Sequence, residues 1–213
     1  MMFIIWIAIV SITPEIGWST ESISLTQKEC QVLLALARSA IATFLDNGYV
    51  EKPDNKFLED HPVFQMPRGV FVTLKKEGRL RGCIGEIYPQ RPLFEGVQYC
   101  AIKSATQDYR FPPVTQDELK SLTLSISVLS LPSKIIAETG THAALLRALI
   151  PGKDGIILVY NRNQSTFLPT VWNEIPEADE FLSHLCQKQG APMDCWQNTN
   201  AVLYRYGTYD FSE

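Results

Sequence analysis

The sequence predicts an α+β fold in which an antiparallel sheet is flanked by helices. Segments of alternating apolar and polar residues come in pairs joined by short turns, which predicts β-hairpins. Amphipathic helical segments stand between these pairs. No internal repeat or linker-like tract interrupts the 213 residues, so helices and strands are expected to share one domain.

The first 24 residues are expected to lie outside this domain, which then spans residues 25–213. Residues 1–12 are nearly all apolar, but a bilayer span takes about 20 such residues. The segment resembles the apolar part of a signal peptide, although it lacks a positively charged leader and the first basic residue is Lys28. A signal or anchor and an added extension both stay open. The chain is otherwise predicted to be cytoplasmic, with no transmembrane span.

The first helix is predicted over residues 26–47. Thr26 and Glu29 have the spacing of a capping box, and apolar residues follow at helical intervals up to Gly48, a natural residue after a helix end. Residues 52–68 are polar and contain three prolines, so a long loop is expected there.

A β-hairpin is predicted next, with strands over residues 69–75 and 79–84 around a glycine-containing turn. Pro92 suits the first turn of a helix that runs to about residue 107. Strict alternation over residues 122–130 then predicts a half-buried strand.

The C-terminal part continues the same pattern. The predicted elements are a short helix over 142–150, strands over 155–160 and 165–168, a helix that ends before Gly190, and a final strand over 201–211.

Composition limits the classes of partner and cofactor. The net charge is −4, from 19 Lys and Arg against 23 Asp and Glu, which argues against nucleic acid as the main partner. The five cysteines are scattered, odd in number and contain no CxxC pair, so free thiols in a reducing compartment are expected instead of disulfides or zinc. With three histidines and no nucleotide-binding fingerprint, no cofactor and no metal is predicted.

The main candidate site is the segment Leu80-Arg81-Gly82-Cys83-Ile84-Gly85. Gly82 and Gly85 lack a Cβ atom, which lets a backbone or a ligand come close. If the strand is regular, Arg79, Arg81 and Cys83 share one face, and the guanidinium of Arg81 favours ionisation of the thiol. The alternative is a solvated basic strand with Cys83 as a small apolar filler.

Further candidates lie in two loops. Asp108 and Arg110 occupy a stretch that ends in two prolines, where they either form a structural ion pair or hold a ligand together with Arg81. His61 and Glu118 are weaker candidates as proton carriers.

Several motifs resemble the AMMECR-type domain family. They are Arg68 to Leu74, Leu80 to Gly85, Asp108 to Pro113, Leu124 to Leu129 and Thr166 to Pro169, in the family's order. The resemblance spans residues 25–213, and the C-terminal part with Trp172 resembles the bacterial branch, protein A of the AmmeMemoRadiSam system.

The resemblance implies two unequal lobes around an antiparallel sheet, with the LRGCIG segment near a cleft, and Memo-type and radical-SAM proteins as partners. It assigns no activity. Two hypotheses follow. One is a module that binds a small anionic ligand or a partner protein through Arg79, Arg81 and Arg110. The other is an enzyme or enzyme component that uses Cys83 as nucleophile or redox thiol.

Overall fold

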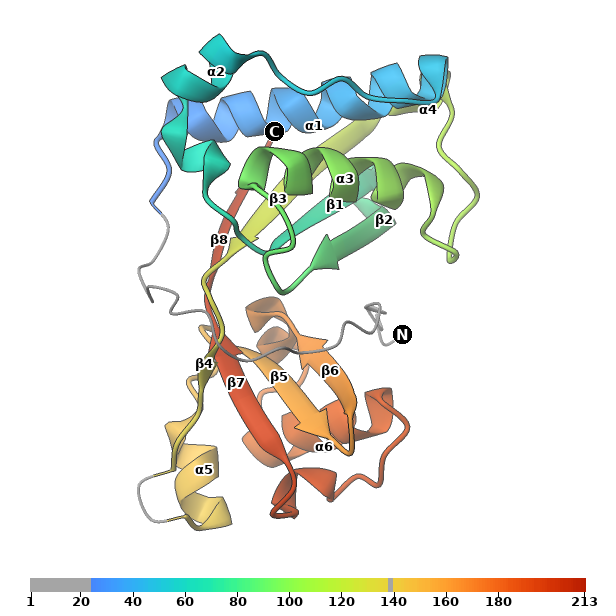
Figure 1. The fold of residues 1–213 in the computed structure, drawn as a ribbon. Coiled ribbons are helices and arrows are strands. Elements are labelled where there is room, and N and C mark those ends of the chain that lie inside the picture. Colours follow the sequence, from blue (N-terminus) through green and yellow to red (C-terminus); the bar gives the residue numbers. More distant parts are fainter. Residues whose placement is uncertain (1–23, 138–139) are drawn as a thin grey trace. The chain divides into compact units, whose positions relative to one another are not determined.

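The computed structural model describes residues 24–137 and 140–213 (Figure 1). These residues form two compact units, each with its own hydrophobic core. The first unit comprises residues 24–130 and 209–213, and the second comprises residues 131–208. The predicted N-terminal extension falls outside the described residues, apart from Ser24.

The first unit contains a four-stranded sheet in the order β2-β1-β3-β8. Its strands are β1 (Val70–Lys76), β2 (Arg79–Glu86), β3 (Leu122–Leu129) and β8 (Thr208–Ser212). The helices α1 (Gln27–Asn47) and α3 (Leu93–Thr106) lie on the same face of this sheet, and the short α4 (Gln116–Leu119) precedes β3 (Figure 1). The core forms between that face and the two long helices.

Local sequence signals explain the bounds of α1. The Thr26 hydroxyl accepts a hydrogen bond from the Glu29 amide at 3.2 Å, and the Glu29 carboxylate accepts one from the Thr26 amide at 2.7 Å. Gly48 ends the helix with a φ of 77°, a conformation that glycine adopts without a steric penalty. The predicted capping box and helix end are confirmed.

The predicted long loop over residues 52–68 is wrong in part, because it contains two short helices. Asp54 caps α2 (Asn55–Asp60) by accepting a hydrogen bond from the Phe57 amide at 2.7 Å. A 3₁₀ turn, η1 (Pro62–Gln65), follows and buries Phe64. Proline suits the first position of a helix, so Pro62 marks a helix start here instead of a loop.

A ridge of small residues on α3 lies directly against the β1–β2 hairpin. Gly96, Cys100 and Ser104 are spaced four residues apart. The Ser104 hydroxyl donates to the Val72 carbonyl and accepts from the Ile84 amide, both at 2.7 Å, so it bridges the paired residues of the two strands. This close approach requires a glycine at position 82, where a Cβ atom would lie 2.2 Å from the Ser104 carbonyl oxygen.

Gly82→Ala is therefore expected to lower the free energy of unfolding of the first unit by about 2 kcal/mol, since overpacking typically costs about 1–3 kcal/mol. The matched control is Gly78→Ala, where the positive φ costs roughly 1 kcal/mol but the added Cβ meets open space. Urea unfolding of both variants makes the comparison. If both variants lose the same free energy of unfolding, the hairpin and α3 move apart to accept the added Cβ atom at little cost.

The second unit contains a second antiparallel sheet, in the order β4-β7-β5-β6. Its strands are β4 (Ser133–Lys134), β5 (Gly155–Tyr160), β6 (Asn163–Phe167) and β7 (Val202–Tyr206), and its helices are α5 (His142–Ala148) and α6 (Ala178–Lys188), with 3₁₀ turns η2 (Pro169–Asn173) and η3 (Cys195–Gln197). The α+β class is confirmed, but the expectation of one sheet is wrong. The predicted single strand over residues 201–211 is two strands in different sheets, β7 and β8, which separate at Gly207.

The expectation of five free thiols is also wrong, because Cys186 and Cys195 form a disulfide. It joins the last turn of α6 to η3 across nine residues of sequence. The spacing lacks a CxxC pattern, and only the reversal of the chain after Gly190 brings the two residues together. Since disulfides persist in oxidising compartments, the cysteine content no longer supports a reducing one.

Within the ranges 24–137 and 140–213, no helix has the length and apolar character needed to cross a membrane. Over the same ranges, no three His, Cys, Asp or Glu side chains gather in a way that could hold a metal ion.

Candidate functional site

The LRGCIG segment lies in β2, the edge strand of the first sheet, and contains a β-bulge at Arg81. Lys75 pairs with Leu80, but Leu74 pairs with Gly82 and Thr73 with Cys83, so Arg81 has no partner residue in the ladder. A bulge shifts the register by one residue and reverses the faces of the side chains beyond it.

The predicted shared face of Arg79, Arg81 and Cys83 is therefore wrong. Cys83 lies opposite Thr73, on the sheet face that points away from α1 and α3. Arg79 lies opposite Lys76, on the other face, and is exposed. Arg81, in the bulge, turns toward α4.

Cys83 is held from three directions. The Thr73 hydroxyl donates a hydrogen bond to the Cys83 sulfur at 3.2 Å. The Cys83 amide donates to the Asp108 carboxylate at 2.8 Å, and the Cys83 carbonyl accepts from Arg110 Nη2 at 3.3 Å. The residue is only 5% exposed. Because a neighbouring strand would bind the same two backbone groups, Asp108 and Arg110 cover the sheet edge at this point.

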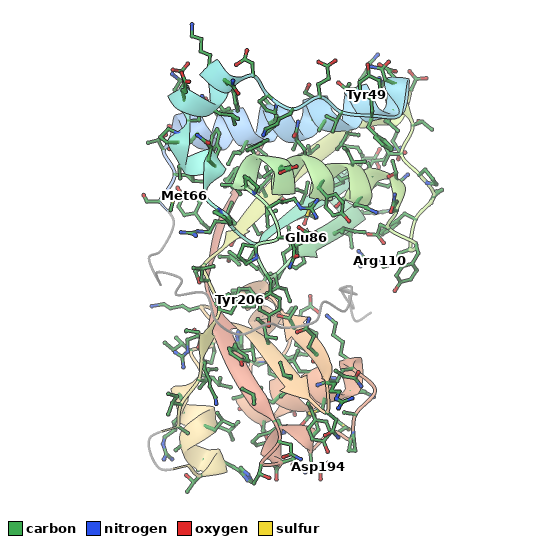
Figure 2. The ribbon with its side chains drawn as sticks, in the orientation of Figure 1. Tyr49, Met66, Glu86, Arg110, Asp194 and Tyr206 are labelled. Carbon is green, nitrogen blue, oxygen red and sulfur yellow. A yellow bond between two sulfur atoms is a disulfide. The ribbon has the colours of Figure 1, made fainter. Side chains whose placement is uncertain are left out.

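Asp108 and Arg110 form the predicted ion pair, in a two-bond geometry. Arg110 Nε donates to Asp108 Oδ1 at 2.8 Å and Nη2 donates to Oδ2 at 2.6 Å. Burial alone would raise the pKa of Asp108, but the hydrogen bonds from Arg110 and from the Cys83 amide outweigh it, so the pKa is lowered. Arg110 lies in the loop that follows α3 (Figure 2).

Arg81 forms a second two-bond pair with Glu118 on α4. The distances from Nε and Nη2 to the two carboxylate oxygens are 2.9 and 3.0 Å, and Nη2 also donates to the Pro112 carbonyl at 2.8 Å. The hydrogen bonds from Arg81, opposed by partial burial and aided by Lys76, lower the pKa of Glu118. Glu118 is thus held as a carboxylate, which makes it a weak proton acceptor. The guanidinium that binds the Cys83 backbone is that of Arg110, whereas the sequence predicted Arg81 beside the Cys83 thiol.

Both guanidinium groups keep one donor nitrogen for a further partner, and both lie near one aromatic ring. Nη1 of Arg81 is buried and has no hydrogen-bond partner among the described residues. The bonds of Arg110 use Nε and Nη2, which leaves its Nη1. The guanidinium carbons of Arg81 and Arg110 lie 5.8 and 5.5 Å from the centre of the Phe111 ring. We call Arg81, Arg110 and Phe111 the arginine cluster.

The two glycines of the segment serve close packing within the protein. Gly82 faces the Ser104 backbone, and a Cβ atom at Gly85 would lie 2.3 Å from the Phe71 ring. Of the two approaches that the sequence left open, by a backbone or by a ligand, the structure shows contact with protein atoms. Contact with a ligand stays a prediction.

His61 lies apart from these groups in the fold, between α2 and η1. Its ring stacks on Phe64 at a centroid distance of 4.8 Å and also contacts Phe57 at 5.0 Å. These contacts give it a structural role, and a role in proton transfer stays a prediction.

Sequence reasoning missed three residues of the site. Thr73 was found only through the register of the bulged hairpin, Ser104 through the close packing of α3, and Phe111 through the loop conformation. The alternation of β1 placed Thr73 on the polar face of its strand. That signal did not identify its partner.

These features define a mixed α+β protein with two antiparallel sheets and a polar cluster at the edge of the first. The AMMECR1 family model matches residues 34–211, and the chain belongs to this family. A protein of Methanosarcina mazei is 42% identical over 193 residues, which cover 89% of this chain and 94% of the relative. A protein of Methanothermobacter thermautotrophicus is 38% identical over 192 residues, covering 89% and 96%.

A solved structure gives the same fold. The crystal structure of the uncharacterized protein PH0010 from Pyrococcus horikoshii matches with a TM-score of 0.77 and 34% sequence identity, over 86% of this chain and 91% of that one. The predicted family and fold class are confirmed. The names of these relatives state no activity.

Proposed function

We propose that this AMMECR1-family protein is a binding module whose arginine cluster takes a small anionic ligand, such as a phosphate or a carboxylate. The observation that carries the proposal is the buried Nη1 of Arg81, which has no partner among the described residues. A buried donor without an acceptor costs about 1–3 kcal/mol, and more when it is charged. Because this nitrogen has almost no exposed surface, an anionic ligand would supply the missing acceptor by displacing the protein atoms that cover it.

The arrangement of charges supports an anion. Lys76, Arg81 and Arg110 are paired with only two carboxylates, Asp108 and Glu118, so one positive charge remains in excess. Each arginine is already oriented by a carboxylate, which reduces the conformational entropy that ligand binding would otherwise cost. Guanidinium groups also match the planar geometry of carboxylates and phosphates.

The experiment is a titration with inorganic phosphate and with malate, followed by NMR of the Arg110 and Cys83 amides. We expect saturable shifts that weaken as salt rises, because exposed charge interactions are screened. Arg81→Gln should lower the affinity at least about tenfold, which corresponds to about 1.4 kcal/mol.

Arg147→Gln is the matched control, since Arg147 is exposed on α5 in the second unit. It should leave the affinity unchanged. If neither anion produces saturable shifts in the folded protein, the arginine cluster serves only to hold β2 and α4 together.

A second candidate function rests on the hydrogen bond from Thr73 to the Cys83 sulfur. A donor to the sulfur favours the thiolate, as a nucleophile or redox thiol requires. Alkylation should then label Cys83 before Cys100, whose side chain is fully buried and whose pKa is raised by that burial. If Cys83 reacts only after denaturation, the enzyme hypothesis loses its nucleophile.

Family resemblance also leads us to place the chain in the bacterial branch, with Memo-type and radical-SAM proteins as partners. The motifs Leu80 to Gly85 and Asp108 to Pro113 support this placement by resemblance alone. Purification from the native cell, with mass spectrometry of what accompanies the protein, tests it. Repeated recovery of the chain without either partner would count against the association.

A further inference from the structure

A pocket of about 380 Å³ lies in the first unit, outside the arginine cluster. It is bounded by α1, by residues 50–54 and by Phe57 and Gln98. After Gly48 the chain reverses and runs back along α1 to reach α2 (Figure 1). The volume falls within the range of small-molecule sites, roughly 300–1,000 Å³. We call it the α1 pocket.

The walls of the α1 pocket are fixed by contacts to α3. Gln98 Nε2 donates to the Glu51 carbonyl at 3.1 Å. The neighbouring Lys52 places its ammonium 5.5 Å from the centre of the Phe94 ring, one helical turn before Gln98. Two consecutive residues of the returning segment are therefore bound to the same helix, which pre-forms the pocket.

Gln98 is the buried polar side chain among the residues that line this pocket, which also include Ser39 and Thr43. The residue is only 6% exposed, yet its one hydrogen bond to the described residues uses a single N–H of the amide. One N–H donor and the Oε1 acceptor stay available. The amide oxygen is open to the pocket, so a ligand with a matching donor and acceptor can reach this group.

The other lining residues narrow the class of ligand. Leu36, Ala40, Val50 and Pro53 provide apolar walls, and Phe57 provides an aromatic ring on which a planar ligand can stack. The charges at the rim are Glu51 and Asp54 against Lys52. This excess of negative charge disfavours an anion.

We propose that the α1 pocket binds a small neutral planar molecule that carries an N–H donor next to an acceptor on one edge, as a lactam or a nucleobase does. Gln98 would pair with that edge in two hydrogen bonds, in the manner in which glutamine reads adenine. The apolar walls would cover the ring faces. The site is separate from the arginine cluster in both position and preferred charge.

Uracil is the probe, and 1,3-dimethyluracil is its control, because methylation removes the N–H donors and keeps the ring. NMR of the full chain should show saturable shifts at Ala40, Val50 and Phe57 with uracil. The dimethyl compound should bind at least about tenfold more weakly, the usual minimum cost of one lost hydrogen bond in a buried polar site.

Gln98→Met removes the amide at similar volume and should lower uracil affinity by at least about tenfold. Gln31→Met, the same change at an exposed position of α1, should have no effect. The comparison of the two compounds on the unchanged protein keeps the test decisive if Gln98→Met unfolds. Equal binding of both compounds, or no saturable shifts with uracil, would overturn the proposal.

Discussion

Loss of the Cys186–Cys195 disulfide is expected to lower the free energy of unfolding of the second unit by about 3 kcal/mol. The bond closes a loop of nine residues in sequence separation, and the chain-entropy relation gives about this value for a loop of that size. Both cysteines are buried, so their replacement by serine adds the cost of polar groups in an apolar setting.

The measurement is urea unfolding of the full chain with and without reductant, beside the double variant Cys186→Ser, Cys195→Ser. Reductant should destabilise the unchanged protein but leave the double variant unaffected, because the variant has no disulfide to lose. If reductant shifts neither protein, the two sulfurs are not bonded in solution. The two cysteines would then lie close together only because the core packs them side by side.

The second large effect is expected at Asp108. Asp108→Ala removes the carboxylate that binds both Arg110 and the Cys83 amide, so a partly buried guanidinium and a backbone donor lose their acceptor. Breaking a buried ion pair costs about 3–5 kcal/mol, and because Arg110 keeps 20% of its side chain exposed we expect the lower end, about 3 kcal/mol.

A double-mutant cycle separates the pair from its surroundings. Arg110→Leu in the Asp108→Ala background should restore part of the lost stability, since it removes the unpaired charge. Urea unfolding of the four proteins gives the coupling energy. Strict additivity of the two single losses would contradict the proposed pairing.

The contribution of Asp108 should depend on pH in one direction. Its pKa is lower in the folded protein than in the unfolded chain, so its stabilisation is fully present above the unfolded value of about 3.9 and is lost as pH falls through the folded value. The stability difference between the unchanged protein and Asp108→Asn should therefore shrink in acid. A stability difference that grows as the pH falls would show that folding does not lower the pKa of Asp108.

In the first unit, the sequence predicts an element correctly where the pattern that marks it involves residues close along the chain. The capping box at Thr26, the glycine after α1 and the alternation of β3 each involve neighbours along the chain, and each led to the correct element. Asp54 offered the same kind of signal for α2. The three prolines around it favoured a loop, although Pro62 in fact begins a helical turn.

The site depended on a feature that periodicity does not reveal. The turn at Glu77 and Gly78 pairs Lys76 with Arg79, and regular pairing from there would place Cys83 opposite Val72, facing the core. The bulge at Arg81 moves Cys83 opposite Thr73 and sends Arg81 to Glu118. Asp108 and Arg110, two residues apart, were paired correctly because their contact is local.

The disulfide and the division of the last strand were missed because both depend on tertiary structure. Alternation continues from β7 into β8, and the change of sheet at Gly207 follows from which strands are available for pairing. Cysteine spacing likewise did not reveal that the chain reverses between α6 and η3.

The Ser104 hydroxyl within the β1–β2 ladder has a consequence for the order of folding. Ser104 lies 20 residues from Ile84 and 32 residues from Val72, so this part of the hairpin closes only after the chain has returned with α3 in place. A hairpin normally forms from local contacts within microseconds. Contacts between residues this far apart in sequence must first overcome the entropy cost of loop closure. The strand pairing around Cys83 therefore forms late, when α3 docks on the sheet. A nascent chain that ends before residue 104 cannot form this part of the hairpin.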